Sequence, residues 1–118
     1  MDRRALGQKG EKLAQDYLKS KGYRVLEANY RCSIGEIDII AENKNRFAFV
    51  EVRTRSSVEY GTPEESITEA KKEKLASLCM EYISNHKISR EWHFDLVAVE
   101  VNTDGKVKRI EHLLDVLD

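Results

Sequence analysis

The chain has 118 residues, of which 41% are hydrophobic and 35% are charged, a composition typical of a globular protein and not of a disordered one. No apolar run is long enough to cross a bilayer, and the first residues, MDRRALGQKGEK, lack the apolar core of a signal peptide. We therefore expect a single domain over residues 1–118, located in the cytoplasm and without a membrane partner.

The net charge of −1 does not by itself indicate a nucleic-acid partner. Residues 1–55 carry 12 Lys/Arg against 8 Asp/Glu, whereas residues 56–118 carry 8 against 13. A basic half that contains acidic residues is compatible with a site facing phosphates, although chance asymmetry on a solvated surface explains it equally well. Cys32 and Cys79 fit no metal-binding spacing and are expected to be free thiols, and the three scattered histidines give little support to zinc chemistry.

The first two elements follow from periodicity and a glycine. A helix is predicted from about Arg4 to Lys21, because apolar residues recur on one helical face and Gly22 stands where helices end. A short strand, YRVLEAN (23–29), and a polar loop, YRCSIG, follow.

The next segments form a predicted β-hairpin. The runs EIDIIAE (36–42) and RFAFVEVRT (46–54) are rich in β-branched and aromatic residues, and Asn43-Lys44-Asn45 between them is a suitable turn.

The second half begins with a polar loop over residues 55–61. Thr62, with Pro63 and a Thr-x-x-Glu capping box, is the favoured start of a second helix, Thr68 is the rival start, and the helix extends to about His86. A strand is predicted over 92–101, a turn at Asp104-Gly105, a strand over 106–111 and a short helix over 112–118. The order α-β-β-β-α-β-β indicates an α/β fold, a mixed sheet flanked by helices.

Charged residues occupy the predicted hairpin where apolar ones are expected. Since side chains alternate between the faces of a strand, Glu51 and Arg53 share a face, as do Glu36 and Asp38. An antiparallel turn brings the start of one strand beside the end of the other, so these four residues are predicted to converge on one patch.

Carboxylates held together near apolar surface repel one another, and desolvation adds to the cost. A hard divalent cation such as Mg²⁺, or Mn²⁺ in its place, would compensate by taking carboxylate oxygens. It would polarise a phosphoryl oxygen and activate a water, and a fixed cation beside it would stabilise developing charge. The alternative is a solvated edge with ordinary surface ions.

The Asp38…Glu51-x-Arg53 pattern across a hairpin resembles the Asp…Glu-x-Lys signature of the PD-(D/E)xK nuclease superfamily, which includes restriction enzymes and Holliday-junction resolvases. The whole chain is more closely similar to the YraN-type family of small bacterial endonuclease-like proteins. The likeness runs through KGEKLAQDYLKSKGYRVLEANYR, GEIDIIAE, FAFVEVRTR, YGTPEESI and HFDLVAVEV. It implies a restriction-endonuclease-like core that binds nucleic acid.

The resemblance also implies roles for single residues. Asp38 and Glu51 match the two acidic metal ligands, and the backbone carbonyl of Val52 often joins them. Glu11 matches an acidic residue that borders the metal site, and Lys71 aligns with a family lysine. Glu36, next to the motif, is expected to support the ligands without being one.

Arg53 stands where the superfamily usually has lysine. Arginine is always charged and suits a two-pronged grip on phosphate, so Arg53 would stabilise charge but not act as a base. Three explanations stay open: the metal alone activates the water, Lys71 supplies the ammonium, or the site binds without cutting.

Other residues are weaker candidates. Most aromatic residues are expected in the core. Asp95, in the middle of an apolar strand, needs a partner, and structural pairing with an arginine is favoured over a role in the site. Tyr30, Arg31 and Arg55 are minor candidates for a phosphate path.

Three functions follow from these observations. The first is a metal-dependent endonuclease that hydrolyses DNA, including branched DNA, and works as a homodimer where two strands are cut. The second is a nucleic-acid-binding module with weak or no catalysis. The third is a small interaction protein with a vestigial site.

Overall fold

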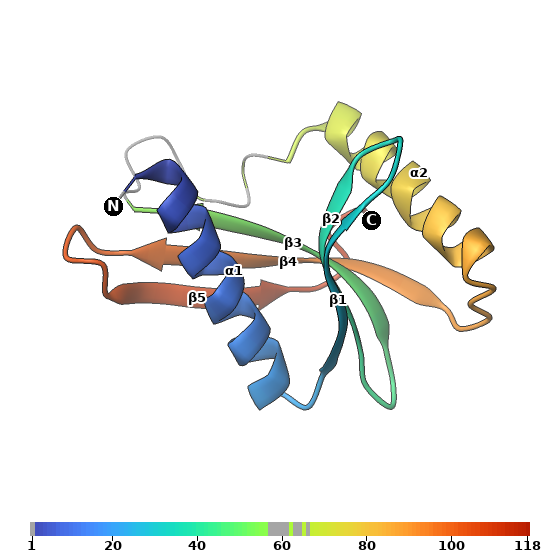
Figure 1. Cartoon of the computed structure of the whole chain (residues 1–118), viewed down its shortest axis with the longest axis horizontal. Helices are drawn as coiled ribbons and strands as arrows, with labels where there is room; N and C mark the ends of the chain where they lie inside the picture. The colour runs from blue at the N-terminus through green and yellow to red at the C-terminus, as the bar shows by residue number, and fades with distance from the viewer. Residues whose placement is uncertain (1, 57–61, 63–64, 66) are drawn as a thin grey trace.

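The described part of the chain forms two helices and five strands, and Figure 1 shows one helix on each side of a twisted sheet. The computed structural model describes residues 2–56, 62, 65 and 67–118. Helix α1 (Arg3–Ser20) precedes strands β1 (Arg24–Arg31), β2 (Glu36–Glu42) and β3 (Phe47–Arg55). Helix α2 (Glu69–Asn85), β4 (Trp92–Val101) and β5 (Val107–Leu113) complete the order α-β-β-β-α-β-β. The α/β class predicted from the sequence is confirmed.

The sheet is mixed, with the strands in the order β1-β2-β3-β4-β5. The pairs β1–β2, β2–β3 and β4–β5 are antiparallel, whereas β3 and β4 are parallel because α2 carries the chain back between them. This mixed sheet with a helix on each face is consistent with a restriction-endonuclease-like core. Neither helix in the described part of the chain is long and apolar enough to span a membrane.

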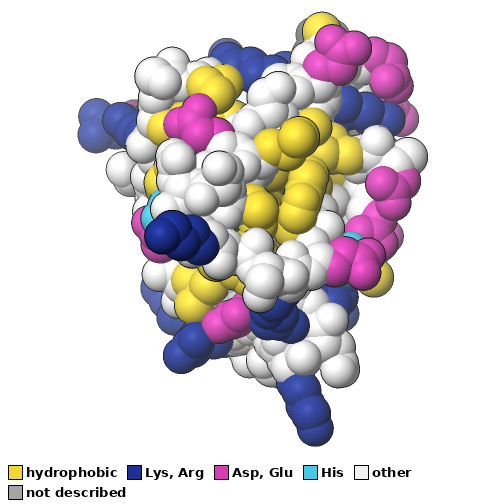
Figure 2. Space-filling model, turned by 90° about the vertical axis from the view of Figure 1, so that its right-hand side faces the viewer, with side chains coloured by type: hydrophobic (Ala, Val, Ile, Leu, Met, Phe, Trp, Pro, Cys, Tyr) yellow, Lys and Arg dark blue, Asp and Glu magenta, His cyan; other side chains and the backbone are white. Residues whose placement is uncertain are grey.

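Alternation of apolar side chains along the central strands produces two cores. On one face, Ala14 and Leu18 of α1 cover Ile39, Val50 and Val97. On the other face, α2 packs against a second cluster, which consists of Ile37, Ile40, Phe47, Phe49 and Phe94 with Leu75, Leu78, Cys79 and Tyr82. The side of the molecule that carries α2 exposes hydrophobic side chains among charged ones (Figure 2), and the exposed Met80 belongs to this helix.

Three of the turns form at residues whose types favour them, Gly22, Asn43 and Gly105. Gly22 ends α1 with a φ of 92°, and Gly105 turns the chain between β4 and β5 with a φ of 85°, both in the left-handed region that favours glycine. Asn43 closes the β2–β3 turn, since its Oδ1 accepts hydrogen bonds from the backbone nitrogens of Asn45 and Arg46.

Helix α2 begins at the rival start and not at the favoured one. Thr68 is the N-cap, and its Oγ1 accepts a hydrogen bond from the Lys71 nitrogen. The Thr62 carbonyl accepts a short-range hydrogen bond from the Glu65 nitrogen. Pro63 and Glu64 lie outside the described residues. Threonine is a good N-cap at either position, so the capping box that favoured Thr62 in the sequence was not sufficient to fix the start of the helix.

The predicted C-terminal helix over 112–118 is wrong. Strand β5 continues to Leu113, and the following residues cross the end of the sheet instead of coiling. Asp115 has a φ of 53°, its nitrogen donates to Asp95 Oδ1 over 2.9 Å, and Val116 nitrogen donates to the Phe94 carbonyl. These tertiary bonds take the backbone groups that a helix would have used.

Asp95 is a structural residue, as favoured from the sequence. It is fully buried and its carboxylate accepts hydrogen bonds from Arg46 at 3.1 and 3.2 Å. His112 Nε2 lies 2.8 Å from the same carboxylate. The Arg46 guanidinium also contacts Asp115 at 3.1 Å, and His93 Nδ1 lies 2.7 Å from Asp115. This network ties the C-terminal segment to β4.

Candidate metal centre

The site lies where β2 and β3 separate. The β2–β3 ladder runs from Glu42–Phe47 to Ile39–Val50, and beyond it the Asp38 Oδ2 atom accepts a hydrogen bond from the Val52 nitrogen over 2.8 Å. A carboxylate therefore replaces the next rung of the ladder. The strict alternation expected for β2 also changes here, since Ile37 and Ile40 pack in the same core despite their odd spacing.

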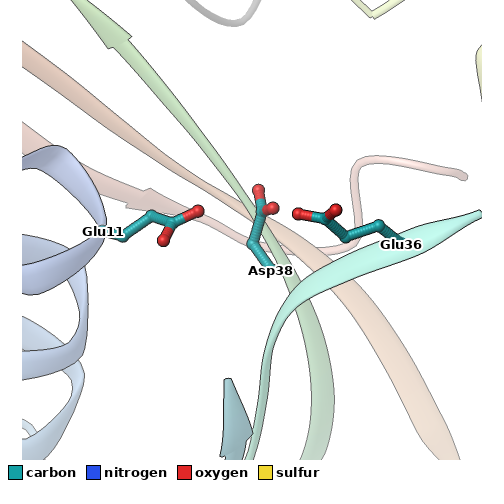
Figure 3. A group of neighbouring side chains, drawn as sticks. All are labelled: Glu11, Glu36 and Asp38. Atoms are coloured by element: carbon teal, nitrogen blue, oxygen red, sulfur yellow. The ribbon is translucent and has the colours of Figure 1, made fainter. Parts of the chain in front are cut away.

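Three acidic side chains meet at this opening. Figure 3 shows Glu11 of α1 and Glu36 of β2 pointing toward Asp38, which lies between them. One carboxylate oxygen from each residue lies within 4.8 Å of the other two. Glu36, expected only to support the ligands, is thus part of the acidic cluster itself, although it also forms an ion pair with Arg31 over 3.1 Å.

A close helix–strand contact places Glu11. Gly10 is buried on α1, and a Cβ atom there would lie 2.8 and 2.9 Å from the Cβ and Cγ2 atoms of Thr54 on β3. Only glycine lets the helix approach β3 so closely. Glu11 follows directly, so this contact sets the distance between its carboxylate and the strands.

Asn29 supports Glu11 from the neighbouring strand. Its φ is 56°, a left-handed conformation that asparagine tolerates better than most residues. With the amide oriented to satisfy both of its polar atoms, the Asn29 nitrogen lies 3.2 and 3.3 Å from the two Glu11 carboxylate oxygens. Sequence reasoning missed this residue, since a left-handed asparagine inside a strand leaves no periodic signal.

The electrostatics of the cluster favour a bound cation. The pKa of Asp38 is raised to about 8, first by burial and then by the charge of Glu51 and a hydrogen bond with its carboxyl group, against the lowering effect of the Val52 nitrogen. The pKa of Glu11 is also raised, first by burial and then by Glu36 and Glu51, while Asn29 opposes the shift. The carboxylates thus repel one another in the absence of a positive charge.

Arg53 offsets part of this repulsion. Its guanidinium lies 2.7 Å from the Glu51 carboxylate, and its side chain is about one third exposed, at 32%. The two residues are two apart on β3 and share a face, as predicted from the sequence. Arg53 therefore neutralises Glu51 at the edge of the site, and Arg31 pairs with Glu36 on the other side, so that among the described residues no Lys or Arg forms an ion pair with Glu11 or Asp38.

These residues line one cavity of about 720 Å³ between the first turns of α1 and the ends of β2 and β3. Its lining includes all four acidic residues, then Val52 and Arg53, and beyond them Arg3, Gly7 and Arg55. Oxygen donors of this kind fit Mg²⁺ or Mn²⁺, which bind carboxylate and carbonyl oxygens. Glu11, Asp38, Glu51 and Val52 were predicted as ligands, and the structure adds Glu36 to the donors available.

The remaining sequence candidates lie elsewhere. Lys71 is exposed on the first turn of α2 and is not part of the cavity lining. Lys74, one turn later, comes closer to β2, because a Cβ on Gly35 would lie 3.8 Å from its Nζ atom. Tyr30 packs edge-on against Tyr82. Of the residues considered for a phosphate path, only Arg55 lines the cavity.

Comparison with known proteins agrees with the likeness seen in the sequence. The model of the uncharacterised protein family UPF0102 matches residues 10–99. A UPF0102 protein of Caldanaerobacter subterraneus subsp. tengcongensis is 38% identical over 98% of this chain and 96% of its own length. A UPF0102 protein of Thermodesulfovibrio yellowstonii is 45% identical over 95% and 97%, and one of Moorella thermoacetica is 44% identical over 94% and 93%.

Proposed function

Because the chain belongs to the UPF0102 family, whose description names no activity, we propose a function from the site itself: a metal-dependent endonuclease that hydrolyses phosphodiesters of DNA. Family membership confirms the YraN-type resemblance. The observation that carries the proposal is the convergence of carboxylate oxygens from Glu11, Glu36 and Asp38 within 4.8 Å, beside Glu51. We place the activity in the cytoplasm, in a single domain over residues 1–118.

Each residue has a distinct part in this proposal. Asp38, Glu51 and Glu11, with Glu36 and the Val52 carbonyl, would hold Mg²⁺ or Mn²⁺, which when bound supplies polarisation of a phosphoryl oxygen and a more acidic water. Asp38 also keeps the strands apart through its bond from the Val52 nitrogen. Asn29 orients Glu11.

Arg53 would bind the phosphate. Its planar guanidinium suits two oxygens of a phosphodiester and stays charged at every relevant pH. Because it already contacts Glu51, it is held in place before a substrate arrives, and its positive charge would favour the extra negative charge of the transition state. With Arg53 unable to accept a proton, proton removal from the attacking water would fall to other groups; Lys71 stays a candidate through resemblance only.

A second function is favoured by the same ion pair. At 2.7 Å from Glu51, the Arg53 guanidinium neutralises one of the acidic residues, which would weaken metal binding. A nucleic-acid-binding module with little or no cleavage is therefore the alternative. Homodimer formation would follow if the substrate is a four-way junction, since two strands must then be cut.

The test is an assay of purified protein on labelled single-stranded, linear, flapped and four-way DNA, with Mg²⁺, Mn²⁺ or EDTA. We expect metal-dependent cleavage that Asp38→Asn abolishes and Asp16→Asn retains, because Asp16 is an exposed carboxylate paired with Lys12 on α1. Cleavage that persists in Asp38→Asn would show a contaminating nuclease. Metal-dependent binding without cleavage would select the binding module, and absence of both would leave the interaction protein.

A further inference from the structure

The cavity continues past the carboxylates along β3, and its continuation is basic. Glu51, Arg53 and Arg55 are alternate residues of β3, and all three line the cavity. Alternate residues of a strand are about 6.6 Å apart, a step comparable with that between successive phosphates of an extended nucleic-acid strand. Arg3, on the first turn of α1, lines the same cavity.

Arg55 and Arg3 differ from the other arginines near the sheet. Arg24, Arg31, Arg46 and Arg90 each form an ion pair with a carboxylate. Within residues 2–56, 62, 65 and 67–118, neither Arg55 nor Arg3 has an ion pair or a side-chain hydrogen bond. Arg55 is nevertheless only partly exposed, so a partly buried arginine lines the cavity, and its five donors meet no acceptor among the described residues.

Gly7 leaves the space that a ligand would need. It lines the cavity from α1, and a Cβ atom there would meet no other atom within 4 Å. Glycine inside a helix costs about 0.5–1 kcal/mol relative to alanine, and packing does not require it here. The whole cavity, about 720 Å³, is of the size that holds a drug-sized molecule, roughly 300–1,000 Å³, and so admits the backbone of one strand.

We infer that Arg55, assisted by Arg3, binds the phosphate adjacent to the one held at Arg53, on the same strand, so that the ligand is an extended nucleic-acid strand with at least two consecutive charged linkages. This inference rests on the proposed function, since it assumes a phosphate at Arg53. It adds a second phosphate position to the proposed function and places the nucleic-acid strand along β3. It also explains why a glycine occupies position 7, since a side chain there would fill the space of the ligand.

The experiment uses two single-stranded oligonucleotides of equal length and equal net charge. In one, every second linkage is an uncharged methylphosphonate, so that no two neighbouring linkages are both charged, wherever the protein binds along the strand. In the other, the charged linkages are contiguous in one half. Binding to the full-length protein is measured by fluorescence anisotropy with Ca²⁺, which takes the same oxygen ligands as Mg²⁺ with looser geometry.

We expect the wild type to bind the contiguous form roughly tenfold more tightly, the scale of one charge-assisted contact. Arg55→Ala should abolish this preference, and Arg24→Ala, a control at the far end of the β1–β2 pair, should retain it. Gly7→Leu should weaken binding of both oligonucleotides without lowering the melting temperature, because it fills the cavity with a good helix former.

Failure of the inference and failure of the proposed function give different results. If the wild type binds both oligonucleotides equally, or if Arg55→Ala keeps the preference, the second phosphate position is wrong while nucleic-acid binding stands. If the wild type binds neither of these oligonucleotides nor an unmodified strand, both proposals fall.

Discussion

The Asp38 carboxylate of β2 stands in for the backbone of its own strand, because its Oδ2 atom accepts the bond of 2.8 Å from the Val52 nitrogen of β3. The last backbone pair of the β2–β3 ladder is Ile39–Val50, immediately next to Asp38 on β2. One side chain therefore both opens the sheet and supplies an oxygen to the acidic cluster. A substitution at position 38 is informative only if it preserves the first task, and asparagine does so through its amide oxygen.

The first prediction concerns pH and stability in EDTA. Asp38 has a pKa raised from 3.8 to about 8 in the folded protein, chiefly by burial and then by Glu51. Its contribution to stability is therefore complete below pH 4 and is lost as the pH rises toward 8. The free energy of unfolding, measured by urea titration, should fall over this window in the wild type. Asp38→Asn should flatten the fall and be the more stable protein at pH 8, because asparagine has no buried charge to form as the pH rises. Equal slopes for the two proteins would contradict this account.

The second prediction tests whether Glu36 is a metal ligand or only a surface residue paired with Arg31. If it is a ligand, Glu36→Gln should weaken Mn²⁺ binding in calorimetry and reduce the stabilisation by the metal, which is about 2.7 kcal/mol at a hundredfold excess over Kd. Arg31→Ala, which removes the ion-pair partner of Glu36, should leave Mn²⁺ affinity unchanged or higher.

Asp16→Asn serves as the matched control for removal of a carboxylate in the Mn²⁺ experiment. If Glu36→Gln binds Mn²⁺ as tightly as this control does, Glu36 is not a ligand. If the wild type binds no Mn²⁺ at all, the metal centre itself is wrong.

The third prediction concerns Arg53. Each phosphate contact contributes about −0.9 to the slope of log K against log salt on duplex DNA. Arg53→Ala should lower that slope in magnitude by about one unit, whereas Arg53→Lys should retain it. Any cleavage should fall further than binding does, because charge stabilisation matters most in the transition state.

If Arg53 were only the ion-pair partner of Glu51, Arg53→Ala would change stability by about 0–1 kcal/mol and leave the salt slope untouched. Binding of a short duplex and of a four-way junction at several salt concentrations decides between the two. Binding of neither DNA at low salt would favour the interaction protein.

The fourth prediction tests the buried network at the other end of the sheet. Asp95→Ala removes the carboxylate that holds Arg46 and His112, and breaking a buried pair from one side costs about 3–5 kcal/mol. Denaturant unfolding should show this loss, while Mn²⁺ affinity of the folded fraction stays the same. A loss below about 0.5 kcal/mol, the range of surface substitutions, would mean that Asp95 contributes little to stability.

Local signals in the sequence were enough for much of the fold. The bounds of β2 and β4 agree with the predicted runs 36–42 and 92–101, because each run is apolar and ends at turn-forming residues. The C-terminal segment, residues 112–118, was predicted as a short helix, which it is not. Its actual path depends on Asp95 and Arg46, which are distant in sequence, and no local pattern contains that information.

The candidate site also has features that the local sequence predicts and features that depend on contacts between distant segments. The proximity of Asp38 and Glu51 follows from hairpin register alone, so sequence reasoning reached it. The distance of Glu11 from Glu36 and Asp38, and the positions of Arg3 and Gly7 along the cavity, depend on where α1 lies on the sheet. The Gly10–Thr54 contact fixes that position, and two residues 44 positions apart in the chain give no periodic sign of their meeting.

That contact also restricts how the protein can change over generations. A methyl group at position 10 would collide with the Cβ atom of Thr54 as well as with its Oγ1 and Cγ2 atoms. Alanine and serine at position 54 keep that Cβ atom, so neither makes room for the methyl group. Glycine at position 54 would make room for the methyl group, but glycine inside a strand is itself unfavourable. Whichever position is substituted first, the single variant should be less stable than the pair present here, so replacement of both residues requires passage through a destabilised protein. Divergence of this lineage should proceed around residues 10 and 54, and not through them.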